Sequence, residues 1–222
     1  MQLSESTKEI LKNFSEINPN LKITPGKEIK TISTMKNILA TATVAEEFPQ
    51  DIAIYDLNEF LGVMSLFSKP KFAFDDKSMT MQEEGTSTKS KYYFADASIL
   101  TVPQKDVKMP EAEVSFTLTE TDLTKVKKAA AMLQLPDVSI SSKGSDIMLS
   151  AIDKKNDTAN NFSIKVGTTD KTFEFHFKTE HLKMLPGDYN VNISSKLISN
   201  FKHKTKPVEY WVALENTSKY TG

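Results

Sequence analysis

Few side chains of this 222-residue chain have the type and spacing that enzyme or metal chemistry needs. Histidines occur at 176, 181 and 203; the first two are five residues apart across an expected strand-to-helix junction, unlike the i, i+4 helical face of a zinc-binding pair. Adjacent acids occur at 46–47, 75–76 and 83–84. Neighbours on a strand point to opposite faces, so we interpret these acids as solvated turn residues. The absence of cysteine excludes thiolate chemistry.

Glycine spacing excludes the common phosphate-binding and nucleophile motifs. The seven glycines are never closer than twenty residues, whereas the P-loop, the G-x-G-x-x-G fingerprint and the G-x-S-x-G elbow need clustered glycines. No loop has the D-x-[DN]-x-[DN]-G calcium pattern. The sequence therefore predicts no catalytic residue, no metal site and no cofactor. A hydrolase whose residues converge only in the folded chain stays open.

The charge inventory is unusual because all 28 basic side chains are lysines and none is arginine. They are balanced by 29 acids, giving a net charge of −1, which excludes a uniformly basic nucleic-acid binder but not one with segregated charge. Arginine has a planar guanidinium group that grips phosphate or guanine through two hydrogen bonds, and this chain has none. We therefore do not expect sequence-specific DNA recognition. Codon bias in an AT-rich genome would equally account for the lysines. With no secretion signal or membrane-length apolar run, we expect a soluble cytosolic protein.

The elements that must position these lysines follow the same order in both halves of the chain. In the first half, apolar periodicity predicts helices at 4–17 and 57–67, with strands at 21–23, 28–33, 39–44, 51–55, 71–74, 78–83 and 90–94. The second half repeats helix and strands, with helices at 120–134 and 179–185 and strands at 113–117, 138–142, 146–152, 162–166, 172–177, 189–194, 197–201 and 209–214.

Residues 95–110 carry two prolines and no period, which is typical of an extended connector between domains. We therefore expect a duplicated α+β unit with antiparallel sheets, divided into domains 1–110 and 111–222.

Lysines lie opposite the expected apolar faces of two equivalent helices. They are Lys8 and Lys12 on the first helix and Lys125 and Lys128 on the third, with Lys127 to one side. Lys178 and Lys183 flank the fourth helix. A solvated surface would look the same, but two equivalent helices with one polarity favour a single surface built from both.

Several blocks of sequence are distinctive: LKNFSEIN (11–18), DIAIYDLNEFLGVMSL (51–66), MLPGDYNV (184–191) and YWVALE (210–215). The connector ADASILTVPQKDVKMP (95–110) and the helix end MLQLPDVSI (132–140) add to them. On these blocks the chain resembles the sliding clamps of T-even-type myoviral bacteriophages over essentially its whole length. IYDLNEFLG is the most specific block, and the regions around 69–91 and 153–175 diverge.

This resemblance implies two similar domains of the DNA-clamp fold, with antiparallel sheets outside and two helices per domain lining a ring. It further implies a homotrimer that encircles duplex DNA without reading its sequence, is opened by an ATP-driven clamp loader, tethers the phage DNA polymerase and supports late transcription. The expected location is the cytoplasm of the infected bacterial host, and no enzymatic activity is expected. A non-catalytic phage structural or scaffold protein of duplicated β-rich domains is the alternative.

The resemblance also suggests site residues. Lys12 and Lys128 match basic positions of the family's inner helices, whereas Lys8, Lys125, Lys127 and Lys183 are assigned to DNA from their helical face. For docking of partner peptides at the connector and second domain, the candidates are Ile99, Leu100, Val102, Val107, Met109, Trp211 and Leu214. Each of these also suits an ordinary core or linker position. The lysine-rich segment 196–206 is interpreted as a basic hairpin touching DNA at the ring's rim or as a solvated loop.

Overall fold

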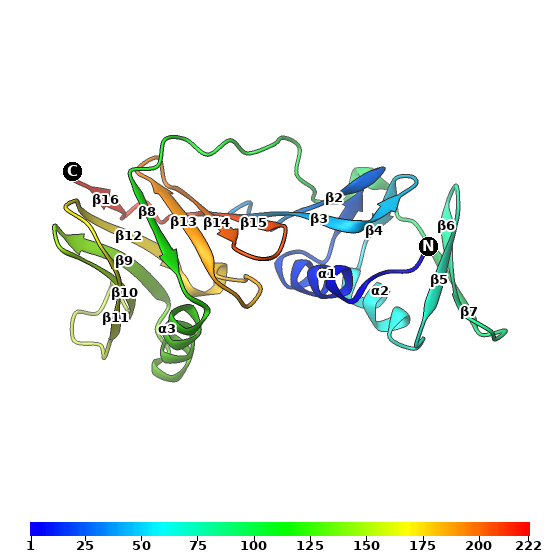
Figure 1. The fold of residues 1–222 in the computed structure, drawn as a ribbon, viewed down its shortest axis with the longest axis horizontal. Helices are drawn as coiled ribbons and strands as arrows, with labels where there is room; N and C mark the ends of the chain where they lie inside the picture. The colour runs from blue at the N-terminus through cyan, green and yellow to red at the C-terminus, as the bar shows by residue number, and fades with distance from the viewer. The chain divides into compact units, whose positions relative to one another are not determined.

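A computed structural model describes residues 1–222, which form two compact units, Met1–Asp106 and Val107–Gly222 (Figure 1). The expected boundary after residue 110 lies in the same strand-free stretch as the division between these units.

The first unit contains two antiparallel sheets and two α-helices. Its sheets have the strand orders β4-β1-β2-β3 and β5-β6-β7. The elements are α1 (Glu5–Ile17), β1 (Leu21–Ile23), β2 (Gly26–Ile32), β3 (Ile38–Phe48), β4 (Ile52–Ile54), α2 (Leu57–Met64), β5 (Pro70–Asp75), β6 (Ser78–Glu83), β7 (Lys89–Tyr93) and a 3₁₀ turn (Ala97–Ile99).

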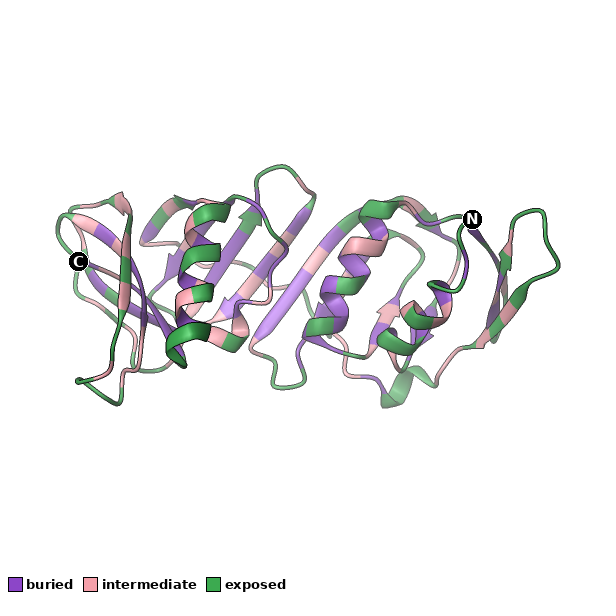
Figure 2. Cartoon of the chain, turned by 90° about the horizontal axis from the view of Figure 1, so that it is seen from below, coloured by how far each residue is buried: buried purple, intermediate pink, exposed green.

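Helix α1 forms as the sequence predicts. The side chain of Ser4 caps it by accepting from the backbone N–H of Thr7, and its buried stripe, which includes Ile10 and Phe14, packs on β2 and β3. Figure 2 shows the buried and exposed faces of this helix. Helix α2, capped by the side chain of Asp56, ends at Met64, three residues before the predicted end.

One buried side chain joins the end of α1 to the connector. Asn18, which is 1% exposed, donates from Nδ2 to the carbonyl oxygens of Ile32 (2.7 Å) and Thr101 (2.8 Å). Its Oδ1 accepts from the backbone N–H of Asn20 at 2.9 Å. The C-terminal end of α1, the end of β2 and the start of the connector are thus fixed to one amide group.

The second unit contains sheets with the strand orders β15-β14-β13-β8 and β11-β10-β9-β12-β16. All of their pairings are antiparallel. The elements are β8 (Val114–Leu118), α3 (Glu120–Leu133), β9 (Asp137–Lys143), β10 (Asp146–Ile152), β11 (Phe162–Thr168), β12 (Thr172–Lys178), a 3₁₀ turn (Thr179–His181), β13 (Tyr189–Ser194), β14 (Ile198–His203), β15 (Val208–Ala213) and β16 (Lys219–Tyr220).

Helix α3 begins at a reciprocal cap. The hydroxyl of Thr119 accepts from the backbone N–H of Asp122 (3.1 Å) and donates to its carboxylate (2.7 Å). Buried Leu123, Val126 and Ala130 form the face that packs on β9, β10 and β11. The helix ends where Gln134 adopts a left-handed conformation with φ of 54°.

The fourth helix, predicted over 179–185, is absent as an α-helix: only the 3₁₀ turn Thr179–His181 forms. Residues 182–187, which we call the strap, continue without regular structure. Side chains hold the strap: the Tyr210 hydroxyl accepts from the Leu185 N–H (3.2 Å), and the Tyr189 hydroxyl donates to the Leu185 carbonyl (2.5 Å).

The basic segment 196–206 contains strand β14, which pairs antiparallel with β13 and β15, so the segment belongs to a hairpin rather than to a solvated loop. Lys202 on that strand forms an ion pair with Glu209. The two-residue strand β16 was not predicted. None of the helices has the length and apolar character needed to cross a membrane.

Candidate nucleic-acid interface

The lysines of α1 lie on the side of the helix that faces away from the sheet. Lys8 and Lys12 are one helical turn apart. Lys8 Nζ lies 2.7 Å from Glu5 Oε1, and its side chain is 25% exposed. Lys12 is exposed, and its ammonium makes no ion pair or hydrogen bond. Since α1 also carries three acids, its positive potential is local rather than uniform.

A hollow of about 430 Å³ separates α1 from α2 on this side. It is lined by Lys8, Lys12, Ser15, Glu16, Asn58, Leu61, Gly62 and Met64. Gly62 leaves open space there, because a Cβ at this position would meet nothing within 4 Å. Two ammonium groups on the edge of a partly apolar hollow can contact the phosphates of a polyanion without reading bases.

The three lysines of α3 are not equivalent. Lys125 and Lys128 are exposed, and neither ammonium makes an ion pair or hydrogen bond. Lys127 is half-buried, and its Nζ donates to the backbone carbonyl of Leu182 at 2.8 Å. Lys183, the next residue along the strap, is also half-buried. The structure therefore groups Lys125 with Lys128 and gives Lys127 a different environment.

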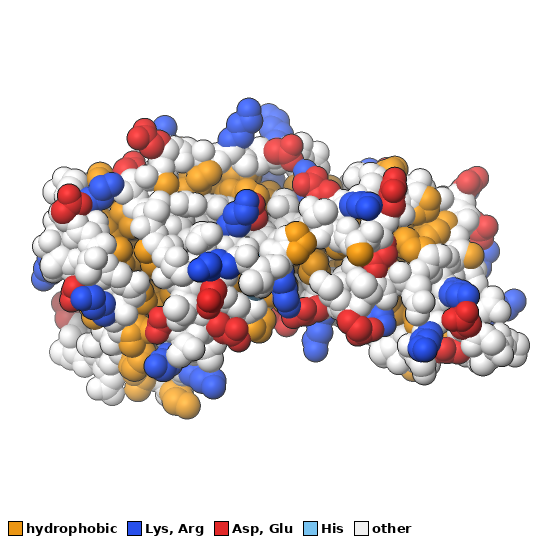
Figure 3. All heavy atoms as spheres, in the orientation of Figure 1, with side chains coloured by type: hydrophobic (Ala, Val, Ile, Leu, Met, Phe, Trp, Pro, Cys, Tyr) orange, Lys and Arg blue, Asp and Glu red, His pale blue; other side chains and the backbone are white.

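Many lysines elsewhere are neutralised by neighbours. Ion pairs join Lys22 to Asp51, Lys71 to Glu84, Lys165 to Asp146, Lys202 to Glu209, and both Lys154 and Lys178 to the buried Asp137. On the face drawn in Figure 3, lysines and acids are interspersed. Lys12, Lys125 and Lys128 have no such ion pair, which they share with other exposed lysines such as Lys27 and Lys36. What sets them apart is their place on the exposed faces of α1 and α3, where their charges are free for an external anion.

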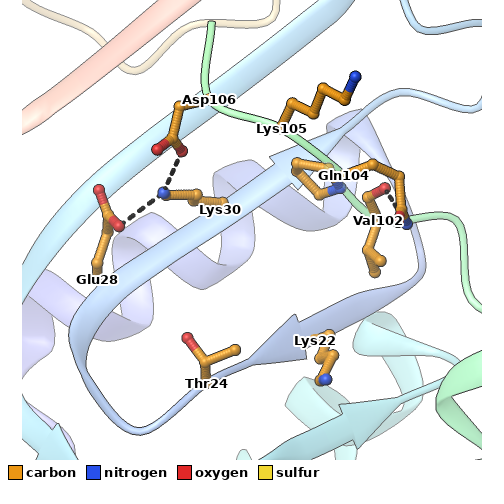
Figure 4. A pocket seen from close by; sticks show the side chains of 9 residues that line it. Lys22, Thr24, Glu28, Lys30, Val102, Gln104, Lys105 and Asp106 are labelled. Carbon is orange, nitrogen blue, oxygen red and sulfur yellow. Dashed lines mark hydrogen bonds and ion pairs between the residues drawn. The ribbon is translucent and has the colours of Figure 1, made fainter.

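The connector crosses the β1–β2 hairpin and encloses a second hollow, of about 300 Å³ (Figure 4). Lys30 Nζ bridges Asp106 Oδ1 (2.7 Å) and Glu28 Oε2 (2.8 Å). The hydrogen bond with Lys30 lowers the pKa of the Asp106 carboxyl, and the bonds with Asp106 and Glu28 raise the pKa of Lys30. This ion pair was not predicted, because no local pattern relates residues 76 positions apart.

The predicted peptide-docking residues have varied environments. Ile99 is 60% exposed, Leu100 is 8% exposed, and half-buried Val102 lines the connector hollow. Val107, Met109 and Trp211 are half-buried, whereas Leu214 is buried. The indole N–H of Trp211 is buried without a hydrogen-bond partner. The described hollow gathers only Val102 from this set, alongside polar side chains of the first unit.

The two α+β units with antiparallel sheets have the fold of the DNA clamps. The proliferating cellular nuclear antigen of Entamoeba histolytica is similar with a TM-score of 0.72, at 12% identity, over 96% of this chain and 97% of that chain. A chain of the PCNA2–PCNA3 complex of Sulfolobus tokodaii gives 0.68, at 11% identity, over 97% and 99%. These similarities confirm the expected fold class.

The sequence places the chain within that class. It is 34% identical to the sliding clamp of Vibrio phage KVP40 over 97% of this chain and 99% of the relative, and 30% identical to that of Escherichia phage RB69 over 99% of both. Residues 4–101 match the DNA polymerase processivity factor family and residues 115–216 match the gp45 sliding clamp, C terminal family. The chain belongs to the phage sliding clamp family of DNA polymerase processivity factors, as the sequence blocks predicted.

Proposed function

We propose that this protein assembles as a homotrimeric ring that encircles duplex DNA and tethers the phage DNA polymerase during processive synthesis. The observation that carries the proposal is the full-length similarity to proteins named sliding clamp. In this proposal an ATP-driven loader opens the ring, the late transcription machinery also uses it, and it works in the cytoplasm of the infected bacterium. No catalytic residue is required.

The mechanism we propose is topological. A clamp must retain DNA while moving along it, so its phosphate contacts must be weak, exchangeable and independent of sequence. Unpaired lysine ammoniums on α1 and α3 suit this requirement, because each is a mobile point charge. A bidentate arginine at the same place would hold one phosphate or read one guanine.

Assembly and topology can be tested together. A homotrimer would have three times the 24.9 kDa mass of the chain, which is about 75 kDa under closed cyclic symmetry. Loaded clamp should stay on circular duplex DNA and be lost from the same DNA after linearisation. A monomer at all concentrations would refute the ring, and equal retention on both DNA forms would refute encirclement.

The DNA-facing assignment has a matched test. Lys12→Glu combined with Lys128→Glu should weaken salt-sensitive retention on circular DNA while the trimer persists. The control is Lys71→Glu with Lys202→Glu, an equal change of charge at exposed lysines outside the helices. Equal effects of the two double variants would show that net charge, not this face, controls retention.

Docking of partner peptides remains a proposal for Ile99, Leu100, Val102, Val107, Met109, Trp211 and Leu214. Its support is the mixture of exposed and half-buried apolar side chains along the connector and the unpartnered Trp211 N–H. Binding of a polymerase C-terminal peptide should weaken after Ile99→Asp. Unchanged binding would exclude the exposed start of the connector from the docking site.

A further inference from the structure

The contact between α3 and the strap gives Lys127 an unexpected environment. Its Nζ donates to the Leu182 carbonyl at 2.8 Å, at the point where the 3₁₀ turn ends. Leu182 is 3% exposed, so its carbonyl lies where water has little access. A buried carbonyl without a donor costs about 1–3 kcal/mol, which explains a half-buried lysine at this position. The lysine stem also covers apolar surface while the ammonium reaches the carbonyl.

Further side-chain bonds hold the strap beyond Leu182. The hydroxyls of Tyr210 and Tyr189 bond to the backbone of Leu185, and His203 Nε2 lies 3.1 Å from the Pro186 carbonyl. The Leu182 N–H itself closes the 3₁₀ turn on the Thr179 carbonyl. Lys127 therefore supplies the hydrogen bond from α3 at the beginning of the strap, directly before Lys183.

We propose that Lys127 is a positioning residue, which fixes the backbone of Lys183 beside α3 instead of contacting phosphate itself. This inference rests on the proposed DNA-encircling function. The amide nitrogen of Lys183 is bonded to the carbonyl carbon that Lys127 holds, so release of the Leu182 carbonyl frees the backbone from which Lys183 projects. The DNA contacts of the second unit then come from Lys125, Lys128 and Lys183.

Two readouts on the intact clamp separate positioning from direct contact. Without DNA, Lys127→Met should speed amide hydrogen exchange at Leu182 and Leu185, whose N–H groups bond to the Thr179 carbonyl and the Tyr210 hydroxyl, by about tenfold. That factor corresponds to loss of roughly 1.4 kcal/mol of local stability. Lys127→Arg, which keeps a donor, should restore most of the protection. Lys128→Met is the matched control on the exposed face of α3 and should leave strap exchange unchanged. Unaltered exchange in Lys127→Met would overturn the positioning role.

The second readout is loader-dependent retention on circular DNA across a salt series. Lys127→Met and Lys183→Met should each lower retention by a similar factor of about two to five, and the double variant should lose no more than Lys183→Met alone. Lys128→Met should add its loss to that of Lys183→Met. Independent, multiplying losses for Lys127 and Lys183 would mean that Lys127 contacts DNA. If no lysine variant alters retention while strap exchange responds, the DNA-facing proposal fails and the DNA part of this inference falls with it.

Discussion

Replacing Gly187 with alanine should destabilise the second unit strongly, because the added methyl group has no room. Gly187 adopts a φ of +146°, and a Cβ there would lie 2.1 Å from His203 Nε2 and 2.6 Å from Cε1. The imidazole cannot move without breaking bonds. Its Nδ1 accepts from the backbone N–H groups of Thr205 (3.2 Å) and Lys206 (3.1 Å), which leaves Nε2 as the donor to Pro186.

The magnitude follows from these contacts. A non-glycine residue at such a φ costs about 1–2 kcal/mol. Displacing His203 sacrifices three hydrogen bonds with a net value of about 0.5–1.5 kcal/mol each. The sum is roughly 2.5–6.5 kcal/mol, a large share of the 5–15 kcal/mol typical of a whole domain.

Urea denaturation followed by circular dichroism measures this loss. With a slope of about 1–3 kcal/mol per molar urea, the midpoint should fall by roughly 2 M. Gly62→Ala is the matched control: Gly62 is an exposed residue of α2 with open space around it, so alanine there should stabilise by about 0.5–1 kcal/mol.

A double-mutant cycle separates the clash from backbone strain. In a His203→Ala background, Gly187→Ala should cost only the backbone portion, about 1–2 kcal/mol. The reasoning is refuted if Gly187→Ala costs less than 1 kcal/mol alone, or if it costs as much with the imidazole removed as with it present.

Three further perturbations test other contacts. Burial lowers the pKa of His181, so the neutral imidazole stabilises the fold above its ordinary pKa of 6.5 and this stabilisation is lost as pH falls. His181→Gln should therefore flatten the decline in thermal stability between pH 7.5 and 5. An unchanged decline would contradict a role for His181. Burial raises the pKa of Glu46, but hydrogen bonds from Thr7 and from the Ser4 backbone outweigh it and lower the pKa below 4.5. In urea titrations Glu46→Gln should therefore cost about 1–2 kcal/mol near pH 7 and progressively less as the pH falls below 4.5, and a cost that does not change with pH would refute the assignment. Lys30→Met should make the connector about two to five times more susceptible to limited proteolysis, since exposed ion pairs are worth about 0–1 kcal/mol. High salt should increase the proteolysis of the native protein in the same way and leave that of the variant unchanged.

The first helix shows what the sequence specifies locally. Ser4 supplies the cap, the apolar stripe supplies the buried face, and Asn18-Pro19 ends the helix. Every signal lies within residues 4–19, so the predicted and observed helices agree closely. The same local consistency made most strands predictable within one to four residues at each end.

The fourth helix was wrongly predicted because tertiary contacts determine that segment. A stretch from 179 to 185 is too short to be stable as an isolated helix. Its backbone groups instead bond to Lys127 and Tyr210, which lie 55 and 25 residues away, and to nearby Tyr189. A local window around the strap contains neither Lys127 nor Tyr210.

The same limit affected the candidate site. Helical spacing correctly placed Lys12, Lys125 and Lys128 on exposed faces. It could not reveal that Lys127 reaches a carbonyl 55 residues away. Spacing determines the direction in which a side chain leaves its helix, whereas its partner depends on the path of the rest of the chain.

The single amide of Asn18 gives the first unit a defined route for mechanical force. A pull applied along the connector reaches the Thr101 carbonyl, and through Asn18 Nδ2 it passes at once to the end of α1 and to Ile32 at the end of β2. The amide is buried, so water cannot readily replace either bond while the force acts. A force along the connector is thereby transmitted to a packed helix and a sheet, and the extended chain alone does not have to resist it.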